Sequence, residues 1–154
     1  MKVLMPRFNK RAVVVKTDVG GAKSERRVDG LVSVVVQDCN SGKILMLAYT
    51  DEAGFRETLA TGRAVYYSTS RNERWCKGET SGDFQLVKRI TVDCDGDALI
   101  YFVEQLGDGA CHTKAESCFY RNVVGGVQLL PAPKAGKNEE LPFVDLPLSD
   151  KISG

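Results

Sequence analysis

The chain has 154 residues, which fits one domain of ordinary size that can bury a core without disulfide bonds. Its 21 basic and 20 acidic residues nearly cancel, so the charge balance argues against a nucleic-acid partner or an acidic tail. No apolar run is long enough for a secretory signal or a membrane span, and we therefore expect a cytoplasmic protein with no membrane partner.

The first half of the sequence predicts a hairpin followed by a helix. Residues 1–29 show no sustained period beyond a short strand at 13–15, and we expect an extension packed on or near the domain. Two apolar runs, 31–37 and 43–49, flank a turn cluster and predict paired strands. Thr50 or Asp51 can cap a helix over 52–60, and Gly62 stands just past its end.

The second half alternates strands with loops. We expect strands at 64–68, 83–93, 98–103 and 119–124, with a polar loop from 69 to 82 and another from 107 to 117. Asp95-Gly96 predicts a two-residue hairpin turn between the second and third of these strands. The expected fold is a β-rich α+β domain over residues 30–125, with one or two helices, followed by a proline-containing tail at 126–154.

Three carboxylates stand at alternate positions in that turn, at Asp93, Asp95 and Asp97. Their mutual repulsion is costly unless a cation lies among them, and hard oxygen ligands of this kind suit Mg²⁺. The alternative is a solvated turn, since aspartate and glycine are common turn residues.

Cys94, Cys111 and Cys118 follow the spacing Cys-x16-Cys-x6-Cys. Three ligands suit a catalytic zinc with an open position for water, although the pattern lacks the close Cys-x2-Cys pair of structural zinc modules. Buried or incidental thiols are the alternative. His112, the only histidine, directly follows Cys111, and an imidazole beside a metal ligand can move protons.

The loop around the only tryptophan combines an aromatic ring, glycines, hydroxyls and positive charge, a mixture that suits a phosphate group. Trp75 can stack on a base or anchor the loop in the core. The candidate substrate-binding residues are Arg71, Trp75, Lys77, Glu79, Thr80, Ser81 and Asp83.

Taken together, these segments resemble the phosphoribosyl-AMP cyclohydrolase family over roughly Gly30 to Arg121. The matching motifs, in family order, include Leu45-Met46-Leu47-Ala48-Tyr49, Lys77-Gly78-Glu79-Thr80-Ser81-Gly82, Asp93-Cys94-Asp95-Gly96-Asp97, Ala110-Cys111-His112-Thr113 and Ser117-Cys118-Phe119-Tyr120. The resemblance implies a hydrolase of histidine biosynthesis that opens the N1–C6 bond of the adenine ring in 1-(5-phosphoribosyl)-AMP.

The resemblance also implies the cofactors and the assembly. Cys94, Cys111 and Cys118 would bind zinc within a homodimer whose subunits both contribute ligands, and Asp93, Asp95 and Asp97 would bind Mg²⁺. The fold implied is a twisted or barrel-like, mostly antiparallel sheet. The ligand implied is a small phosphorylated nucleotide, with His112 as the catalytic residue.

Two departures from the family pattern stand out. Asp83 occupies a position where the family commonly has histidine, and Lys114-Ala115-Glu116 replaces an insert richer in glycine and arginine. A non-catalytic, zinc-stabilised nucleotide-binding module is therefore the alternative function. A zinc nucleobase deaminase is disfavoured because its His-x-Glu and Pro-Cys-x-x-Cys motifs do not occur.

Overall fold

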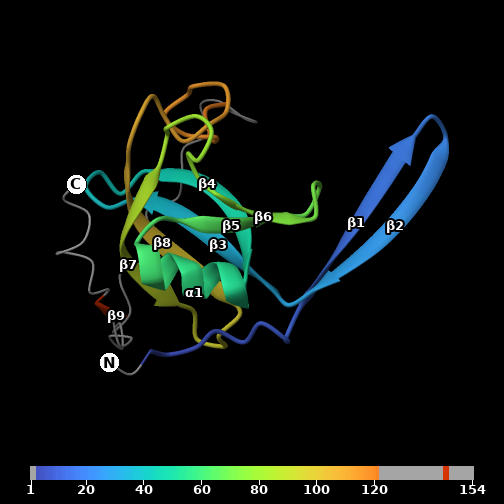
Figure 1. Cartoon of the computed structure of the whole chain (residues 1–154), viewed down its shortest axis with the longest axis horizontal. Coiled ribbons are helices and arrows are strands. Elements are labelled where there is room, and N and C mark those ends of the chain that lie inside the picture. The colour runs from blue at the N-terminus through green and yellow to red at the C-terminus, as the bar shows by residue number, and fades with distance from the viewer. Residues whose placement is uncertain (1–2, 122–143, 146–154) are drawn as a thin grey trace, which may run out of the picture.

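The computed structural model describes residues 3–121 and 144–145, and it shows a curled sheet, one helix and a projecting hairpin (Figure 1). In chain order the elements are β1 (Ala12–Val19), β2 (Ala22–Asp29), β3 (Leu31–Asp38), β4 (Ile44–Asp51), α1 (Glu52–Thr61), β5 (Val65–Ser68), β6 (Glu73–Cys76), β7 (Gln85–Val92), β8 (Ala98–Gln105) and β9 (Val144–Asp145).

The main sheet has the order β6-β5-β4-β3-β8-β7-β9. Only the β3–β8 pair is parallel; the other neighbours in the sheet run antiparallel. The sheet curls into a half-barrel with α1 beside it (Figure 1). The prediction of a β-rich, single-domain α+β fold with a mostly antiparallel sheet is confirmed.

The core lies on the concave side of this sheet, where alternate residues of the central strands point inward. Val32, Val34 and Val36 of β3 are almost completely buried, as are Tyr66 of β5 and Tyr101 of β8. Alternation of this kind places every second side chain on one face of a strand, so the β-branched run predicted as a strand becomes one wall of the core.

The helix begins and ends at the predicted caps. The Asp51 carboxylate accepts the Gly54 N–H at 2.8 Å, and Gly62 has a left-handed φ of 73° with its N–H bonded to the Thr58 carbonyl. The helix runs one residue beyond the predicted range, to Thr61, and its Phe55 is 2% exposed against the core.

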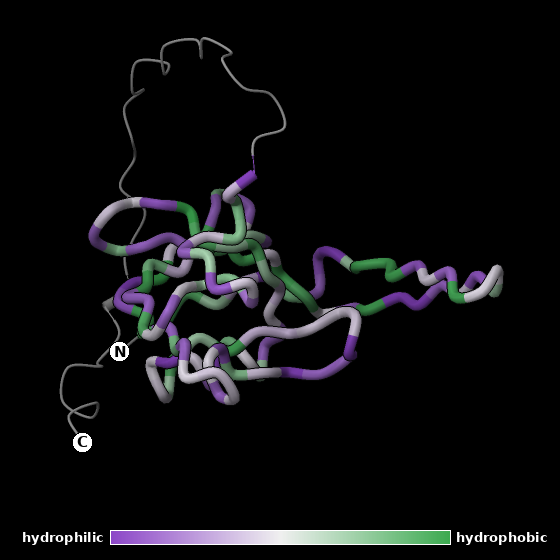
Figure 2. Tube along the Cα trace, turned by 90° about the horizontal axis from the view of Figure 1, so that it is seen from above, coloured by the Kyte–Doolittle hydropathy of each residue, from purple (hydrophilic) through white to green (hydrophobic). Residues whose placement is uncertain are grey.

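The N-terminal residues form two different structures. Residues 3–11 run along the body, where Phe8 is buried and its ring lies 5.8 Å from that of Phe55. Strands β1 and β2 then form a hairpin that projects away from the body (Figures 1 and 2). The predicted strand at 13–15 is therefore only part of a longer one.

Three local predictions were wrong. The loop predicted at 69–82 contains β6, which pairs with β5 through positions such as Tyr66 and Trp75. The β7–β8 turn leaves four residues, 94–97, beyond the Asp93 N–H to Ala98 carbonyl bond, so it is not a two-residue turn. Residues 119–121 are not a strand.

Two further predictions fall largely outside the described residues. They are the rest of the final strand, 122–124, and the tail at 126–154 apart from β9. Within the described part of the chain, no helix has the length and apolar character that crossing a bilayer requires.

Candidate active site

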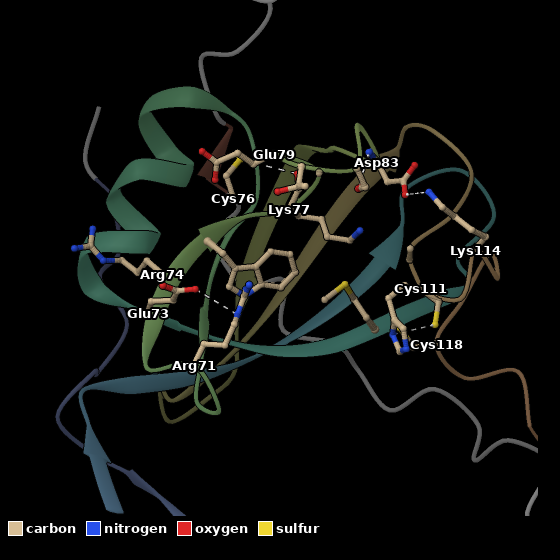
Figure 3. Close-up of a pocket in the computed structure, with 17 residues that line it drawn as sticks. Arg71, Glu73, Arg74, Cys76, Lys77, Glu79, Asp83, Cys111, Lys114 and Cys118 are labelled. Carbon is tan, nitrogen blue, oxygen red and sulfur yellow. Dashed lines mark hydrogen bonds and ion pairs between the residues drawn. The ribbon is translucent and has the colours of Figure 1, made fainter.

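One cavity of about 660 Å³ collects most of the predicted site residues (Figure 3). Its walls come from the turn before β6, from β6 with the loop that follows it, and from the segment 110–118 after β8. The predicted residues that line it are Arg71, Trp75, Lys77, Glu79, Thr80, Ser81, Asp83, Cys111, His112 and Cys118. Two motifs far apart in the sequence therefore face one space.

The glycines of the first loop permit a sharp return of the backbone. Gly78 has a φ of 89°, and a Cβ atom there would lie 2.3 Å from the backbone nitrogen of Phe84. The Gly82 N–H donates to the Gly78 carbonyl at 2.8 Å, which closes the turn that carries Thr80 and Ser81. Both hydroxyl residues are exposed at the pocket and can donate to a bound anion.

Trp75 combines the two roles considered for it. Its half-buried indole packs against the buried ring of Tyr66 at a centroid distance of 5.5 Å, and it also lines the pocket. The Arg71 guanidinium lies 5.9 Å from the indole centroid and 3.4 Å from the Glu73 carboxylate. The ring is therefore fixed by the core while part of it stays open to a ligand.

Lys77 is a buried cation in the pocket wall. The residue is only 7% exposed, and within residues 3–121 and 144–145 no carboxylate forms an ion pair with it. Burial lowers the pKa of its ammonium group because desolvation disfavours the charged form. Figure 3 shows the side chain extending toward Asp83 and the two cysteines. A bound anion would satisfy this charge.

Asp83 joins the two walls of the pocket. Its carboxylate accepts from the Lys114 ammonium at 2.9 Å and from the Asp108 N–H at 2.9 Å. These two partners lower the pKa of Asp83 to about 2. Gly107 makes the approach possible, since a Cβ atom there would lie 2.1 Å from an oxygen of this carboxylate. Both oxygens of the ionised Asp83 carboxylate thus accept hydrogen bonds, so Asp83 is poorly suited to accept a proton from a ligand.

Cys111 and Cys118, two of the three predicted zinc ligands, both line the pocket. The Thr113 hydroxyl donates to the Cys111 sulfur at 3.0 Å and lowers the pKa of that buried thiol. Desolvation of its sulfur, together with its neighbour Cys111, raises the pKa of Cys118. His112 Nδ1 lies 4.0 Å from the Cys111 sulfur. The pair therefore contains one thiol with a lowered pKa beside one with a raised pKa.

Cys94 lies apart from this pair. It is exposed on the β7–β8 turn and does not line the pocket. Among the described residues, the ligand atoms of Asp93, Asp95 and Asp97 form the one group of three that could hold a metal, all within 4.8 Å of one another. The three cysteines do not come together within one chain.

The donor sets differ in how well they fit the two expected metals. Two of the three expected zinc cysteines, Cys111 and Cys118, lie in the pocket, and the His112 imidazole beside them is also a zinc ligand by type. The carboxylates suit Mg²⁺ by type. However, Lys10 contacts Asp95, Arg11 contacts Asp97, and one oxygen of Asp93 accepts three backbone N–H groups. As folded, the three carboxylates already have basic or backbone partners, so a Mg²⁺ ion would compete with these partners for them.

The sequence analysis missed several residues at these two places. Lys114 was noted only as a departure from a pattern, but it lies in the pocket and binds Asp83. Cys76, which the sequence analysis did not include among the site residues, lines the same cavity. Lys10 and Arg11 gave no local signal because their partners lie 85 and 86 positions away.

Comparison with known proteins identifies relatives of this chain. A family model described as "Phosphoribosyl-AMP cyclohydrolase" matches residues 46–120. The phosphoribosyl-AMP cyclohydrolase of Desulfotalea psychrophila is 52% identical over 102 residues, which are 66% of this chain and 80% of that protein. The Halobacterium salinarum protein of the same name is 55% identical over 111 residues, 72% of this chain and 85% of its own.

A bifunctional relative is also similar. The histidine biosynthesis bifunctional protein HisIE of Aquifex aeolicus is 50% identical over 105 residues, which cover 68% of this chain and 51% of that protein.

Proposed function

The chain belongs to the phosphoribosyl-AMP cyclohydrolase family, and from this membership we propose that the pocket between Trp75 and Cys111 is where it opens the adenine ring of phosphoribosyl-AMP in histidine biosynthesis. The observation that carries the assignment is the joining of two separate family motifs in one pocket. The loop at 77–82 supplies charge and hydroxyls, and the segment at 111–118 supplies metal ligands and an imidazole.

The reaction requires a nucleophile, a polarised ring carbon and a proton. The oxygen of water bonds to C6, the N1–C6 bond breaks, and N1 takes up a proton. The chemistry expected of a bound zinc ion would be that of a Lewis acid, which would make hydroxide available near neutral pH. Cys111 and Cys118 would hold the ion in this pocket.

The pocket residues suit the two ends of the substrate. Lys77 is a buried cation without a carboxylate partner among the described residues, and Arg71 adds a second positive charge, so both can bind a phosphate. The Trp75 indole offers a face on which the base can stack. Thr80 and Ser81 can donate to phosphate oxygens from the exposed turn.

His112 is the proposed proton carrier. It lines the pocket beside Cys111, and its exposed ring can exchange protons with water. Asp83 does not suit this role because its carboxylate is occupied by Lys114 and the Asp108 N–H. Instead, Asp83 keeps the segment that carries His112 at a fixed distance from the loop that carries Lys77.

A homodimer would supply the missing zinc ligand. One chain brings only two of the three expected zinc cysteines into the pocket, and Cys94 stands exposed elsewhere. Three large apolar side chains, Leu47, Phe119 and Tyr120, are more than half exposed, and the last two directly follow Cys118. Covering this apolar surface with a second copy would favour association. We therefore expect Cys94 of the partner subunit to complete the site.

Mg²⁺ binding and a cytoplasmic location stay predictions. A Mg²⁺ ion at Asp93, Asp95 and Asp97 would have to displace the basic side chains described above. The prediction of a cytoplasmic location rests on the sequence patterns alone.

Turnover of purified protein on phosphoribosyl-AMP tests the proposal. Ring opening is followed by absorbance, and bound zinc is quantified in the same sample. We expect activity that disappears on chelation and returns with added zinc. Bound zinc without ring opening would contradict the proposal and favour the non-catalytic nucleotide-binding module.

A further inference from the structure

The N-terminal segment 3–11 lies against the β7–β8 turn that carries Cys94. The Arg7 N–H donates to the Gly96 carbonyl at 2.7 Å, and a Cβ atom at Gly96 would lie 3.2 Å from the Arg7 side chain. Phe8 anchors the same segment in the core through its contact with Phe55. A backbone hydrogen bond and an apolar contact therefore hold this segment in place, in addition to its ion pairs.

Two basic side chains at the end of this segment reach the carboxylates of the turn. The Lys10 ammonium contacts Asp95 and lies 3.3 Å from Asp97, and the Arg11 guanidinium donates to Asp97. Asp97 is only 6% exposed, so its charge is largely removed from water. Asp93 is satisfied separately, because one of its oxygens accepts the N–H groups of residues 96, 97 and 98 at 2.9–3.2 Å.

The ion pairs of Lys10 and Arg11 offset the repulsion between the carboxylates of the turn. Carboxylates whose oxygens lie within 4.8 Å of one another repel, and the repulsion is relieved by nearby positive charge. Lys10 and Arg11 together supply two positive charges, the same as one divalent ion. They are tethered to the fold, so their local concentration at the turn is high without any free ligand.

We propose that Lys10 and Arg11 are the built-in counter-ions of the Asp93–Asp97 turn and compete with divalent cations for its carboxylates. The proposal does not depend on the ring-opening reaction. It concerns this chain's own N-terminal segment, which lies outside the residues matched by the family model.

Direct binding of Mn²⁺, used as a spectroscopic stand-in for Mg²⁺, tests the competition. Zinc-loaded protein is titrated with Mn²⁺, and the free ion is followed by electron paramagnetic resonance. We expect the Lys10→Gln/Arg11→Gln variant to bind Mn²⁺ at least about tenfold more tightly than the unaltered chain, because a divalent ion then meets carboxylates without competitors. Adding Asp95→Asn and Asp97→Asn to this variant should abolish the gain.

Two control variants separate local competition from overall charge. Lys16→Gln/Arg27→Gln removes two basic residues of β1 and β2 that pair with Glu25 and Asp29, and it should leave Mn²⁺ binding unchanged. Lys10→Arg/Arg11→Lys keeps both charges and should bind as weakly as the unaltered chain.

Two results would overturn the proposal. One is equal Mn²⁺ affinity in the unaltered chain and in Lys10→Gln/Arg11→Gln. The other is an equal gain in the β1–β2 control. Thermal unfolding gives a second readout: added Mg²⁺ should raise the melting temperature of Lys10→Gln/Arg11→Gln but not that of the unaltered chain, and equal shifts in both would contradict the competition.

Discussion

At the scale of single residues, the burial of Lys77 would favour the binding of an anion in the pocket. Desolvation lowers the pKa of its ammonium group, so the charged form of this lysine is less stable here than in water. A substrate phosphate would offset that loss of stability by forming a charge-assisted hydrogen bond. The same residue in an exposed position would gain much less, because water already solvates it.

Replacing Lys77 should therefore weaken substrate binding. We expect Lys77→Met to raise KM for phosphoribosyl-AMP by about tenfold or more, since a hydrogen bond to a charged group contributes about 1.5–3 kcal/mol. Initial rates over a range of substrate concentrations measure this. Lys88→Met is the matched control, because Lys88 is exposed on β7 and paired with Glu104 at 3.1 Å. Unchanged KM in Lys77→Met would remove Lys77 from the phosphate site.

His112 is the residue whose replacement should affect chemistry more than binding. We expect His112→Ala to lower kcat by about 100-fold, a typical loss for a missing general acid or base, while zinc content stays constant. Steady-state kinetics and metal analysis of the same preparation give both numbers. Near-normal turnover with zinc retained would contradict the proton-carrying role.

At the scale of elements, the Asp83–Lys114 ion pair joins the loop after β6 to the segment after β8. The ion pair also has a predictable pH dependence. The pKa of Asp83 is lowered from 3.8 to about 2 in the folded chain, so its ionised form stabilises the fold above about pH 4. This contribution is lost as the pH falls from about 4 through 2.

The variant Asp83→Asn tests that window. At pH 7 it should have a lower free energy of unfolding than the unaltered chain, and the difference should shrink as the pH approaches 2. Urea unfolding at several pH values between 7 and 2.5 measures the gap. Asp108→Asn is the control, because Asp108 is largely exposed and lies 3.4 Å from the same ammonium. A gap that stays constant down to pH 2.5 would show that this ion pair does not set the acid stability.

The elements best predicted from sequence are those with local signals. The helix was found because Asp51 and Gly62 mark its ends by their own chemistry. Strand β6 was missed because it has only four residues and lies within a polar stretch of sequence. Its strand conformation depends on pairing with β5. The β7–β8 turn was predicted too tight because the Asp93 carboxylate stabilises a wider loop by accepting three N–H groups.

At the scale of the whole molecule, the predicted metal ligands lie at two separate places. One is the pocket with Cys111 and Cys118, and the other is the β7–β8 turn with Cys94. All seven candidate substrate-binding residues line the pocket, and their role in binding the substrate stays a prediction. The contacts of Lys10 and Arg11 were not predictable, because no local pattern indicates a partner 85 positions away.

Because the predicted zinc ligands are divided within one chain, we propose that a second subunit completes the active pocket. Mixing two inactive variants tests it most directly. Cys94→Ser and Cys111→Ser should each lose zinc-dependent turnover, and a mixture refolded together should recover about a quarter of the original activity. Half of randomly formed dimers are mixed, and each mixed dimer has one intact site of two.

A mixture of Cys111→Ser with Cys118→Ser is the matched control, because both ligands belong to the same pocket and every site stays broken. We expect turnover to recover in the first mixture alone. No recovery in the first mixture, or full turnover by Cys94→Ser alone, would contradict a zinc site shared between subunits.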